Sequence, residues 1–327
     1  MDISVIIPTF NRRELLCRTL SLYGRQQGMR GRFEVLVCDD GSTDGTPQML
    51  ESLRDKLGFP LRWFVLNGNA GPSTARNRAI AAASGRVLLI VGDDILPDRQ
   101  LLLEHWNWHT ERHPEMHVGV LGQIRWADEL SPTPFMHWLE QSGTQFGYAR
   151  IQHAEQVDYG FLNTANISVK RELLTSTGEF FDERLRMFED SEWGERLERK
   201  GFELRYNAHA LGLHVHETTL DSSLRRMEVA GAAVFALRGA SRRNYDRLTH
   251  GLFEPAKRTR LRLLRLLLHP AMRRAIYAPL ARLCERRVIA DRVYAACHAS
   301  SFLEGMLKTH GTGARVRPQD AAAQRRP

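Results

Sequence analysis

Three short apolar runs recur in the first hundred residues, and segments with helical spacing separate them. They begin at Ile3 (ISVIIP), Phe33 (FEVLVCDD) and Arg86 (RVLLIVGDD). Runs of this length that are rich in Val, Ile and Leu are typical of buried strands. Strands that alternate with crossover helices form a mainly parallel sheet. The sequence therefore predicts an α/β fold with a Rossmann-like sheet and flanking helices.

The segments between these runs carry signals for helix starts. Asn11 and Glu14 have the spacing of a capping box, and Thr46 and Pro47 suit an N-cap and a first helical residue. Further along, we expect a helix from about residue 97 to 113 and strands at HVGVLGQIRW, FLNTANISVK and FELRYNAHALGLHVH. These elements extend the predicted α/β domain to residue 219.

Charge is distributed unevenly along the chain, whose 327 residues carry a formal net charge of +8. The first two hundred residues are nearly balanced, whereas from Lys257 to Arg292 basic residues greatly outnumber acids. We expect a basic amphipathic helical region over residues 220–310 and a disordered tail over 311–327, which is too polar to fold alone. The basic region therefore binds a different partner from the α/β domain.

Two readings of the basic region stay open. Leucines that alternate with arginines are typical of a helix at an anionic membrane surface, but they also suit helices that pack on the α/β domain. Nucleic acid is not expected, because no binding motif is present and aromatic residues that stack on bases are missing from the pattern.

Several features predict a cytoplasmic protein, with peripheral attachment to the cytoplasmic membrane face as an option. The start MDISVIIPTF lacks a basic signal-peptide region, and no apolar stretch approaches the roughly 20 residues that span a bilayer. The cysteines Cys17, Cys38, Cys284 and Cys297 form no CxxC pair and suit reduced thiols.

Two acidic pairs end predicted strands. Asp93 and Asp94 follow RVLLIVG, at the strand end where open α/β sheets bind ligands, and adjacent carboxylates there favour a divalent cation. The pair also suits a plain turn before a helix. Asp39 and Asp40 end the earlier strand, where Asp40 can accept a hydrogen bond from a base or ribose and Gly41 permits close backbone approach.

Five motifs occur in order: PTFNR at residues 8–12, VCDDGSTDGT from Val37, NAGPSTARNRAI from Asn69, VGDD from Val91 and FEDSEWGERLERKG from Phe188. Together they resemble family 2 glycosyltransferases of the GT-A fold over residues 2–216. The resemblance implies a nucleotide-diphospho-sugar donor, a divalent cation (Mg²⁺ or Mn²⁺) and inversion at the anomeric carbon. The expected acceptor is a glycan or a lipid-linked molecule.

The resemblance also implies roles for particular residues. Donor binding falls to Pro8, Thr9, Asn11, Asp39, Asp40, Arg76 and Asp93. Asp94 is the expected metal ligand, although the extra acid of many relatives is missing, since Gly92 precedes the pair and Ile95 follows it. His214 and His216, two apart on a strand, face the same side and are candidate further ligands or ordinary strand-end histidines.

The catalytic base implied by the resemblance is Asp190, beside Glu189 at a helix start. A carboxylate within hydrogen-bond reach can take the proton of a sugar hydroxyl as it attacks. Acids in a first turn also stabilise the helix dipole without any catalytic role. Glu189, Asn163 and Trp193 are candidate acceptor contacts, and packing explains them equally well.

The sequence thus predicts a metal-assisted, inverting glycosyltransferase that most readily takes a UDP-sugar. A nucleotidyltransferase would need a Gly-rich phosphate loop after the first strand, which PTFNRRE lacks. A non-catalytic scaffold that binds a nucleotide sugar is the other alternative, and the Asp190 motif argues against it.

Overall fold

A computed structural model describes residues 1–253, 257–283 and 287–312. The chain divides into two compact units, which are described separately. The sheet unit comprises residues 1–131, 145–185 and 189–216. The helical unit comprises residues 132–144, 186–188 and the described residues from 217 onward. The predicted tail over 311–327 lies almost wholly outside the described residues.

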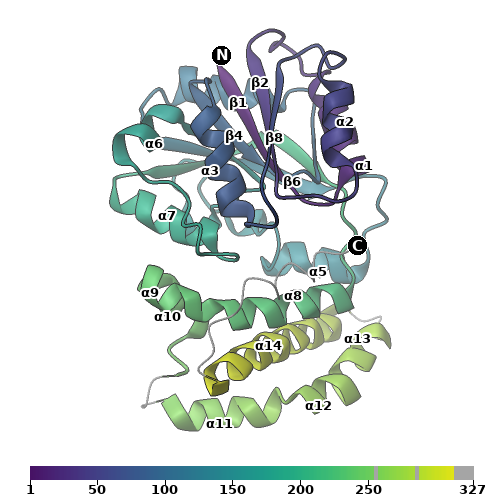
Figure 1. Ribbon diagram of the computed structural model, residues 1–327. Helices are drawn as coiled ribbons and strands as arrows, with labels where there is room; N and C mark the ends of the chain where they lie inside the picture. Colours follow the sequence, from purple (N-terminus) through teal and green to yellow (C-terminus); the bar gives the residue numbers. More distant parts are fainter. Residues whose placement is uncertain (254–256, 284–286, 313–327) are drawn as a thin grey trace. The chain divides into compact units, whose positions relative to one another are not determined.

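The sheet unit is built on a single eight-stranded sheet with the order β3-β2-β1-β4-β7-β6-β8-β5 (Figure 1). The strands are β1 (Ile3–Thr9), β2 (Phe33–Asp39), β3 (Leu61–Val65), β4 (Val87–Val91), β5 (Ile95–Pro97), β6 (Val118–Trp126), β7 (Asn166–Lys170) and β8 (Glu203–His214). Strands β1 to β4 pair in parallel, as predicted. Because β7 runs antiparallel to β4 and β6, and β5 to β8, the complete sheet is mixed.

Helices flank this sheet. They are α1 (Arg13–Tyr23), α2 (Thr46–Leu53), α3 (Pro72–Ala82), α4 (Leu101–Asn107) with a π-helical turn (Trp108–Arg112), α6 (Arg171–Thr177) and α7 (Glu189–Arg199). The predicted helix from residue 97 begins instead at Leu101, because β5 pairs with β8 and extends the sheet to Pro97.

The predicted capping box at Asn11 is wrong. Asn11 has a left-handed backbone (φ 53°), and its side-chain oxygen accepts the N–H of Thr43, 2.8 Å away. The helix begins at Arg13 without a side-chain cap. In the second helix, Thr46 is the first helical residue, and Gly45 stands at the N-cap position that was predicted for Thr46.

The core explains why the acidic pairs meet. Every residue of β2 and β4 is buried, and β1 is buried except for Pro8, so these central strands are fixed in register. Because β1, β2 and β4 are parallel neighbours, their carboxyl ends lie at one edge of the sheet. Thr9, Asp39 and the turn after Val91 therefore share that edge.

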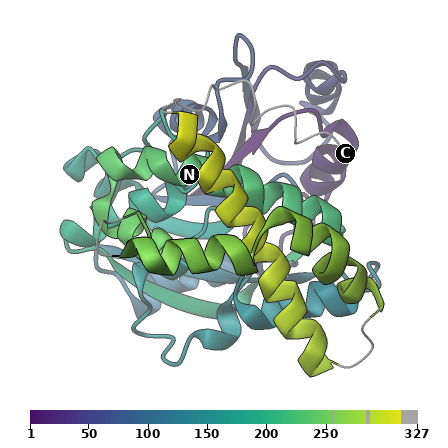
Figure 2. The same cartoon turned by 90° about the horizontal axis from the view of Figure 1, so that it is seen from below.

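The helical unit contains α5 (Pro134–Ser142), α8 (Leu220–Ala233), α9 (Leu237–Ala240), α10 (Arg242–Thr249), α11 (Arg258–Leu267), α12 (Pro270–Met272), a π-helical turn (Arg273–Tyr277), α13 (Ala278–Leu283) and α14 (Arg287–Thr312). Helix α14 packs along α8 (Figures 1 and 2). The two helices approach closely at glycines: a Cβ on Gly305 would lie 1.9 Å from the carbonyl oxygen of Glu228. Over the part of the chain that the structure describes, no helix is both long and apolar enough to cross a bilayer.

Candidate functional site

The turn after β4 carries the pair Asp93 and Asp94, and the guanidinium of Arg12 binds both carboxylates. Arg12 donates from Nη1 to Asp93 Oδ1 at 2.8 Å and to Asp94 Oδ2 at 2.6 Å. Thr9, the last residue of β1, donates its hydroxyl to Asp93 Oδ2 at 2.7 Å. We predicted a divalent cation beside this pair. The sequence analysis missed Arg12, whose guanidinium supplies positive charge there.

The pKa values of the two aspartates are shifted in opposite directions. Burial raises the pKa of Asp93 above its usual range, even with Arg12 beside it. Burial would also raise the pKa of Asp94, but His214 and Arg12 outweigh it and hold that pKa well below the usual range. Asp94 is therefore the more firmly ionised carboxylate and the better ligand for a hard cation.

His214 ends β8 beside Asp94. Its Nε2 lies 3.6 Å from Asp94 Oδ2, and its buried Nδ1 has no hydrogen-bond partner within the described part of the chain. His216 is exposed, with its ring centre 6.1 Å from that of His214. Of the two predicted histidines, the structure brings His214 directly to the acidic pair.

Asp94 and His214 fit a divalent cation as a two-residue ligand set. Oxygen and nitrogen ligands about 2.1 Å from such a cation lie roughly 3 to 4 Å apart, which is the separation of these two side chains. The described residues contain no group of three or more His, Cys, Asp or Glu side chains arranged around one point. A cation here would therefore draw its other ligands from water and phosphate oxygens.

The earlier acidic pair is held by backbone groups. Asp40 Oδ1 accepts the N–H groups of Ala70 and Gly71 at 2.7 and 3.1 Å, and Oδ2 accepts Gly71 at 2.9 Å. Gly41 (φ 83°) passes so near the same loop that a Cβ would lie 2.8 Å from the Cα of Gly68. Asp40 thus fixes the loop that leads into α3.

Asp39 has a different environment from its neighbour. Its Oδ1 accepts the N–H of Ser42 at 2.9 Å, while its buried Oδ2 has no hydrogen-bond partner in the described structure. Burial raises the pKa of Asp39 above its usual range. A buried oxygen of this kind lacks the hydrogen-bond donor that such groups normally have.

The first motif joins the second at this edge. Asn11 donates its backbone N–H to the Ser42 hydroxyl at 2.8 Å, and its side chain binds Thr43. Pro8 is half-buried within β1. Pro8, Thr9, Asn11, Asp39 and Asp40 therefore lie together at the carboxyl-terminal edge of the sheet, where we predicted donor binding.

Arg76 lies on α3 and contacts the base motif. Its Nη1 donates to Glu189 Oε1 at 2.8 Å, and both side chains are about nine-tenths buried. Its guanidinium also lies over the ring of Phe181, 5.3 Å from the ring centre. Glu189, a predicted acceptor contact, is the ion-pair partner of Arg76.

Asp190 is the next residue, half-buried in the first turn of α7, where its Oδ1 accepts the N–H of Ser191 at 2.7 Å. The loop before α7 is clamped to α3. Asn77 donates to the Phe181 carbonyl at 2.9 Å and accepts the Phe181 N–H at 3.0 Å. The loop that Asp40 fixes and the helix that carries Asp190 are thus both tied to α3, a role of Asn77 that helical periodicity did not reveal.

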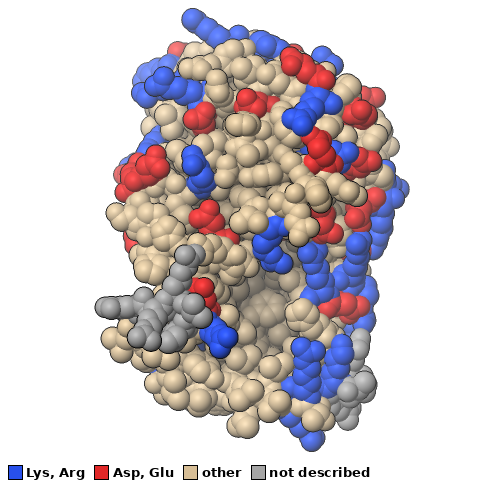
Figure 3. Space-filling model, turned by 180° about the vertical axis from the view of Figure 1, so that it is seen from behind, with Lys and Arg blue, Asp and Glu red and all other residues tan. Residues whose placement is uncertain are grey.

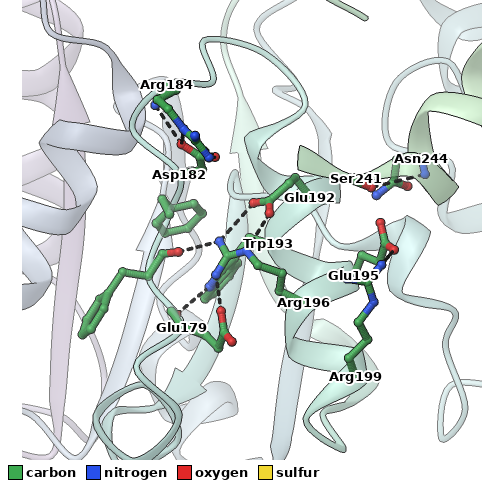
Figure 4. A network of polar contacts seen from close by, with 12 residues as sticks. Glu179, Asp182, Arg184, Glu192, Trp193, Glu195, Arg196, Arg199, Ser241 and Asn244 are labelled. Carbon is green, nitrogen blue, oxygen red and sulfur yellow. Dashed lines mark hydrogen bonds and ion pairs between the residues drawn. The ribbon is translucent and has the colours of Figure 1, made fainter. Parts of the chain in front are cut away.

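Two further acceptor candidates have packing contacts. Trp193 is fully buried, stacks near Phe181 and donates its indole N–H to the Glu179 carbonyl at 3.0 Å (Figure 4). Arg196 bonds Glu192 and Glu179 beside it (Figure 4). The burial of Trp193 favours packing over the predicted acceptor contact. Asn163 donates to the Tyr148 hydroxyl at 3.4 Å.

Residues 4–175 match the protein family described as Glycosyl transferase family 2. The uncharacterized glycosyltransferase YfnE of Bacillus subtilis is 28% identical over 258 residues, which cover 65% of this chain and 64% of the relative. The poly(ribitol-phosphate) β-N-acetylglucosaminyltransferase TarS of Staphylococcus aureus is 33% identical over 116 residues, 36% of this chain and 20% of TarS. The match thus spans less than two thirds of the length of either relative.

Solved structures share the fold. The mannosyltransferase PcManGT of Pyrobaculum calidifontis, in complex with GDP-Man and Mn²⁺, superposes with a TM-score of 0.63 at 20% identity, over 92% of this chain and 86% of that one. Residues 1–349 of S. aureus TarS, in complex with UDP-GlcNAc, superpose with a TM-score of 0.55 at 17% identity, over 97% and 93% of the two chains. These likenesses show that the fold is of the GT-A kind.

Proposed function

The chain belongs to glycosyl transferase family 2, and from this premise we propose that it moves a sugar from a nucleotide-diphospho-sugar to an acceptor hydroxyl with inversion. The observation that carries the proposal is that the loop bound by Asp40 and the segment that carries Asp190 are both attached to α3. Asp40 binds the loop at its start, and Arg76 and Asn77 bind the segment that carries Asp190. Donor and base would therefore be held on one rigid frame.

In this proposal Asp190 is the base. Its carboxylate accepts the proton of the acceptor hydroxyl while that oxygen attacks the anomeric carbon from the face opposite the diphosphate. The new glycosidic C–O bond forms as the bond to the diphosphate oxygen breaks, and the electron pair leaves with the diphosphate. Arg76 holds Glu189 and thereby orients the first turn of α7.

Asp39, Asp40, Thr9 and Asn11 form the proposed nucleotide side of the site. The unpartnered Asp39 Oδ2 offers an acceptor for an N–H or O–H of the nucleoside. A UDP-sugar is the proposed donor, which the TarS complex with UDP-GlcNAc supports, whereas the GDP-Man complex of PcManGT keeps a guanosine donor as the alternative to test.

Asp94 and His214 would hold Mg²⁺ or Mn²⁺, which would stabilise negative charge on the departing diphosphate. The PcManGT complex with Mn²⁺ supports this assignment. Arg12 reaches the same Asp94 oxygen and supplies positive charge there by itself. The acceptor, proposed as a glycan or lipid-linked hydroxyl, would approach Asp190.

The decisive experiment measures transfer and hydrolysis with a panel of UDP- and GDP-sugars, with Mg²⁺ or Mn²⁺. We expect Asp190→Asn to lower kcat by about 10³-fold, because the acceptor loses its base, while donor affinity stays within about twofold of wild type. Asp128→Asn, an exposed change of the same chemistry in the sheet unit, serves as the control.

Two outcomes would contradict the proposal. Near-normal transfer by Asp190→Asn would remove the assigned base. Donor binding without transfer or hydrolysis by the wild-type protein, across the acceptors supplied, would favour a nucleotide-sugar-binding scaffold.

A further inference from the structure

The helical unit exposes large apolar side chains along α11 and along the stretch from α12 to α13. Most of the exposed large apolar residues in the described chain belong to it: Leu263, Leu266, Leu267, Met272, Ile276, Leu280 and Leu283. We call this series, with the arginines around it, the apolar–basic face. Single exposed leucines are common on proteins, but a grouped series marks an interaction surface.

On α11 the apolar residues share one side of the helix. Leu263, Leu266 and Leu267 are spaced by three and four residues, which places their side chains on one stripe. They are 55%, 70% and 51% exposed, so the described residues leave much of this stripe uncovered.

The stretch from α12 to α13 repeats the pattern. Met272, Ile276, Leu280 and Leu283 are spaced by four, four and three residues along a nearly unbroken helical path. Leu283 is 79% exposed. The buried contacts of this stretch come from other residues, such as Ala278 and Ala281. Its apolar series is therefore not needed to attach it to α14.

The same segment carries only positive formal charge. Residues 257–283 contain eight Lys and Arg residues and no Asp or Glu. Arg260, Arg262, Arg265 and Arg274 are exposed, whereas Arg273 forms an ion pair with Glu304 at 2.7 Å. On the face of the molecule that Figure 3 shows, many Lys and Arg side chains lie among Asp and Glu side chains, whereas residues 257–283 contain no acid.

We propose that the apolar–basic face binds the surface of an anionic lipid bilayer, with α11 and the stretch from α12 to α13 lying in the interface plane. Leucines on one stripe enter the boundary between headgroups and acyl chains, and the arginines beside them pair with lipid phosphates. Neither charge alone nor apolar area alone accounts for the face: a nucleic acid would leave the leucines exposed to water, and an uncharged apolar partner would leave the arginines unpaired. The binding needs none of the residues assigned to sugar transfer.

The test is flotation of the full chain with vesicles of phosphatidylcholine alone or with about 30% phosphatidylglycerol. We expect binding to the anionic vesicles at low salt, weak binding to neutral ones, and a decline as salt screens the arginines. No binding to anionic vesicles at low salt, or equal binding to both kinds, would overturn the proposal.

Two variants separate the charge from the apolar stripe. Arg260, Arg262 and Arg265 changed together to Gln should weaken partitioning about a hundredfold, at roughly fivefold for each arginine. Leu263→Ser with Leu266→Ser should weaken it at least tenfold while leaving the secondary structure intact, because both side chains are exposed.

Matched controls come from the sheet unit. Arg25, Arg30 and Arg99, all exposed, are changed together to Gln and remove the same charge. Val65→Ser with Met116→Ser removes exposed apolar side chains elsewhere. Equal losses in the control and test variants would overturn the assignment to this face. A dimer that the leucine variant dissociates, without vesicle binding by wild type, would assign the face to a second copy of the chain.

Discussion

The two acidic pairs of the sheet unit end parallel strands of the same sheet, yet their partners differ in kind. Asp40 is bound by the backbone N–H groups of Ala70 and Gly71, which the loop into α3 fixes in place. Asp93 and Asp94 are bound by Arg12, whose side chain is about 30% exposed. A backbone partner cannot leave without unfolding the loop, whereas a side chain can rotate away. The comparison separates a fixed structural acid from an exchangeable charge site.

The largest effect should come from the exchangeable site. Asp94→Asn removes the most firmly ionised carboxylate of the pair, and we expect transfer to fall by about 10³-fold. In the same variant, binding of Mn²⁺ alone, followed by electron paramagnetic resonance, should fall at least tenfold. Asp128→Asn should leave both readouts unchanged. Full activity in Asp94→Asn would show that this pair only shapes its turn.

The free energy of unfolding tests the earlier pair. Asp40→Asn places an amide NH₂ or a weaker acceptor against the N–H groups of Ala70 and Gly71, and we expect a loss of about 2 kcal/mol in the free energy of unfolding by urea. Asp94→Asn should also lower stability, because Arg12 and His214 hold the pKa of Asp94 well below its usual range and the amide carries no charge for them to stabilise. No loss of stability in Asp40→Asn would contradict its description as the fixed acid.

The sequence predicted the parallel strands, and with them the shared edge, because buried β-branched runs and their connections follow local rules. It could not predict β5, since pairing of Ile95–Pro97 with β8 depends on contacts more than a hundred residues apart. The cap at Asn11 failed for the same reason: its oxygen binds Thr43 on another loop. Local spacing carries no information about such partners.

The sequence likewise predicted only part of the candidate site. The motifs identified Asp39, Asp40, Asp93, Asp94 and Asp190, and their roles stay predictions. The motif PTFNR contained Arg12, but only the folded chain shows its guanidinium between two carboxylates. Burial likewise separates Trp193, which packs in the core, from Asp190, which is half-buried beside the ion pair of Glu189.

Competition between the Arg12 guanidinium and a metal cation for Asp94 can be tested directly. If the guanidinium competes with a cation for Asp94, Arg12→Gln should raise the affinity for Mn²⁺ about tenfold, because one positive charge near the site is removed. Arg13→Gln, which removes the same charge one residue along the chain from a more exposed side chain, should change it less than twofold. Calorimetric titration of both variants with Mn²⁺ measures the difference, and equal affinities would show that Arg12 does not occupy the cation's position.

The smallest effect concerns Asp39, the neighbour of the fixed acid. Burial raises the pKa of Asp39 in the folded protein above its unfolded value, so ionised Asp39 lowers stability at pH 7, and this cost fades as the pH falls through the folded pKa. Asp39→Asn keeps an acceptor for Ser42 and removes the buried charge, and we expect added stability at pH 7 that shrinks toward pH 4. Urea unfolding at both values, beside Asp128→Asn, measures the change. The same substitution should weaken donor binding, because the unpartnered Oδ2 becomes an amide group. Lower stability at pH 7 would show that Asp39, like Asp40, stabilises its turn.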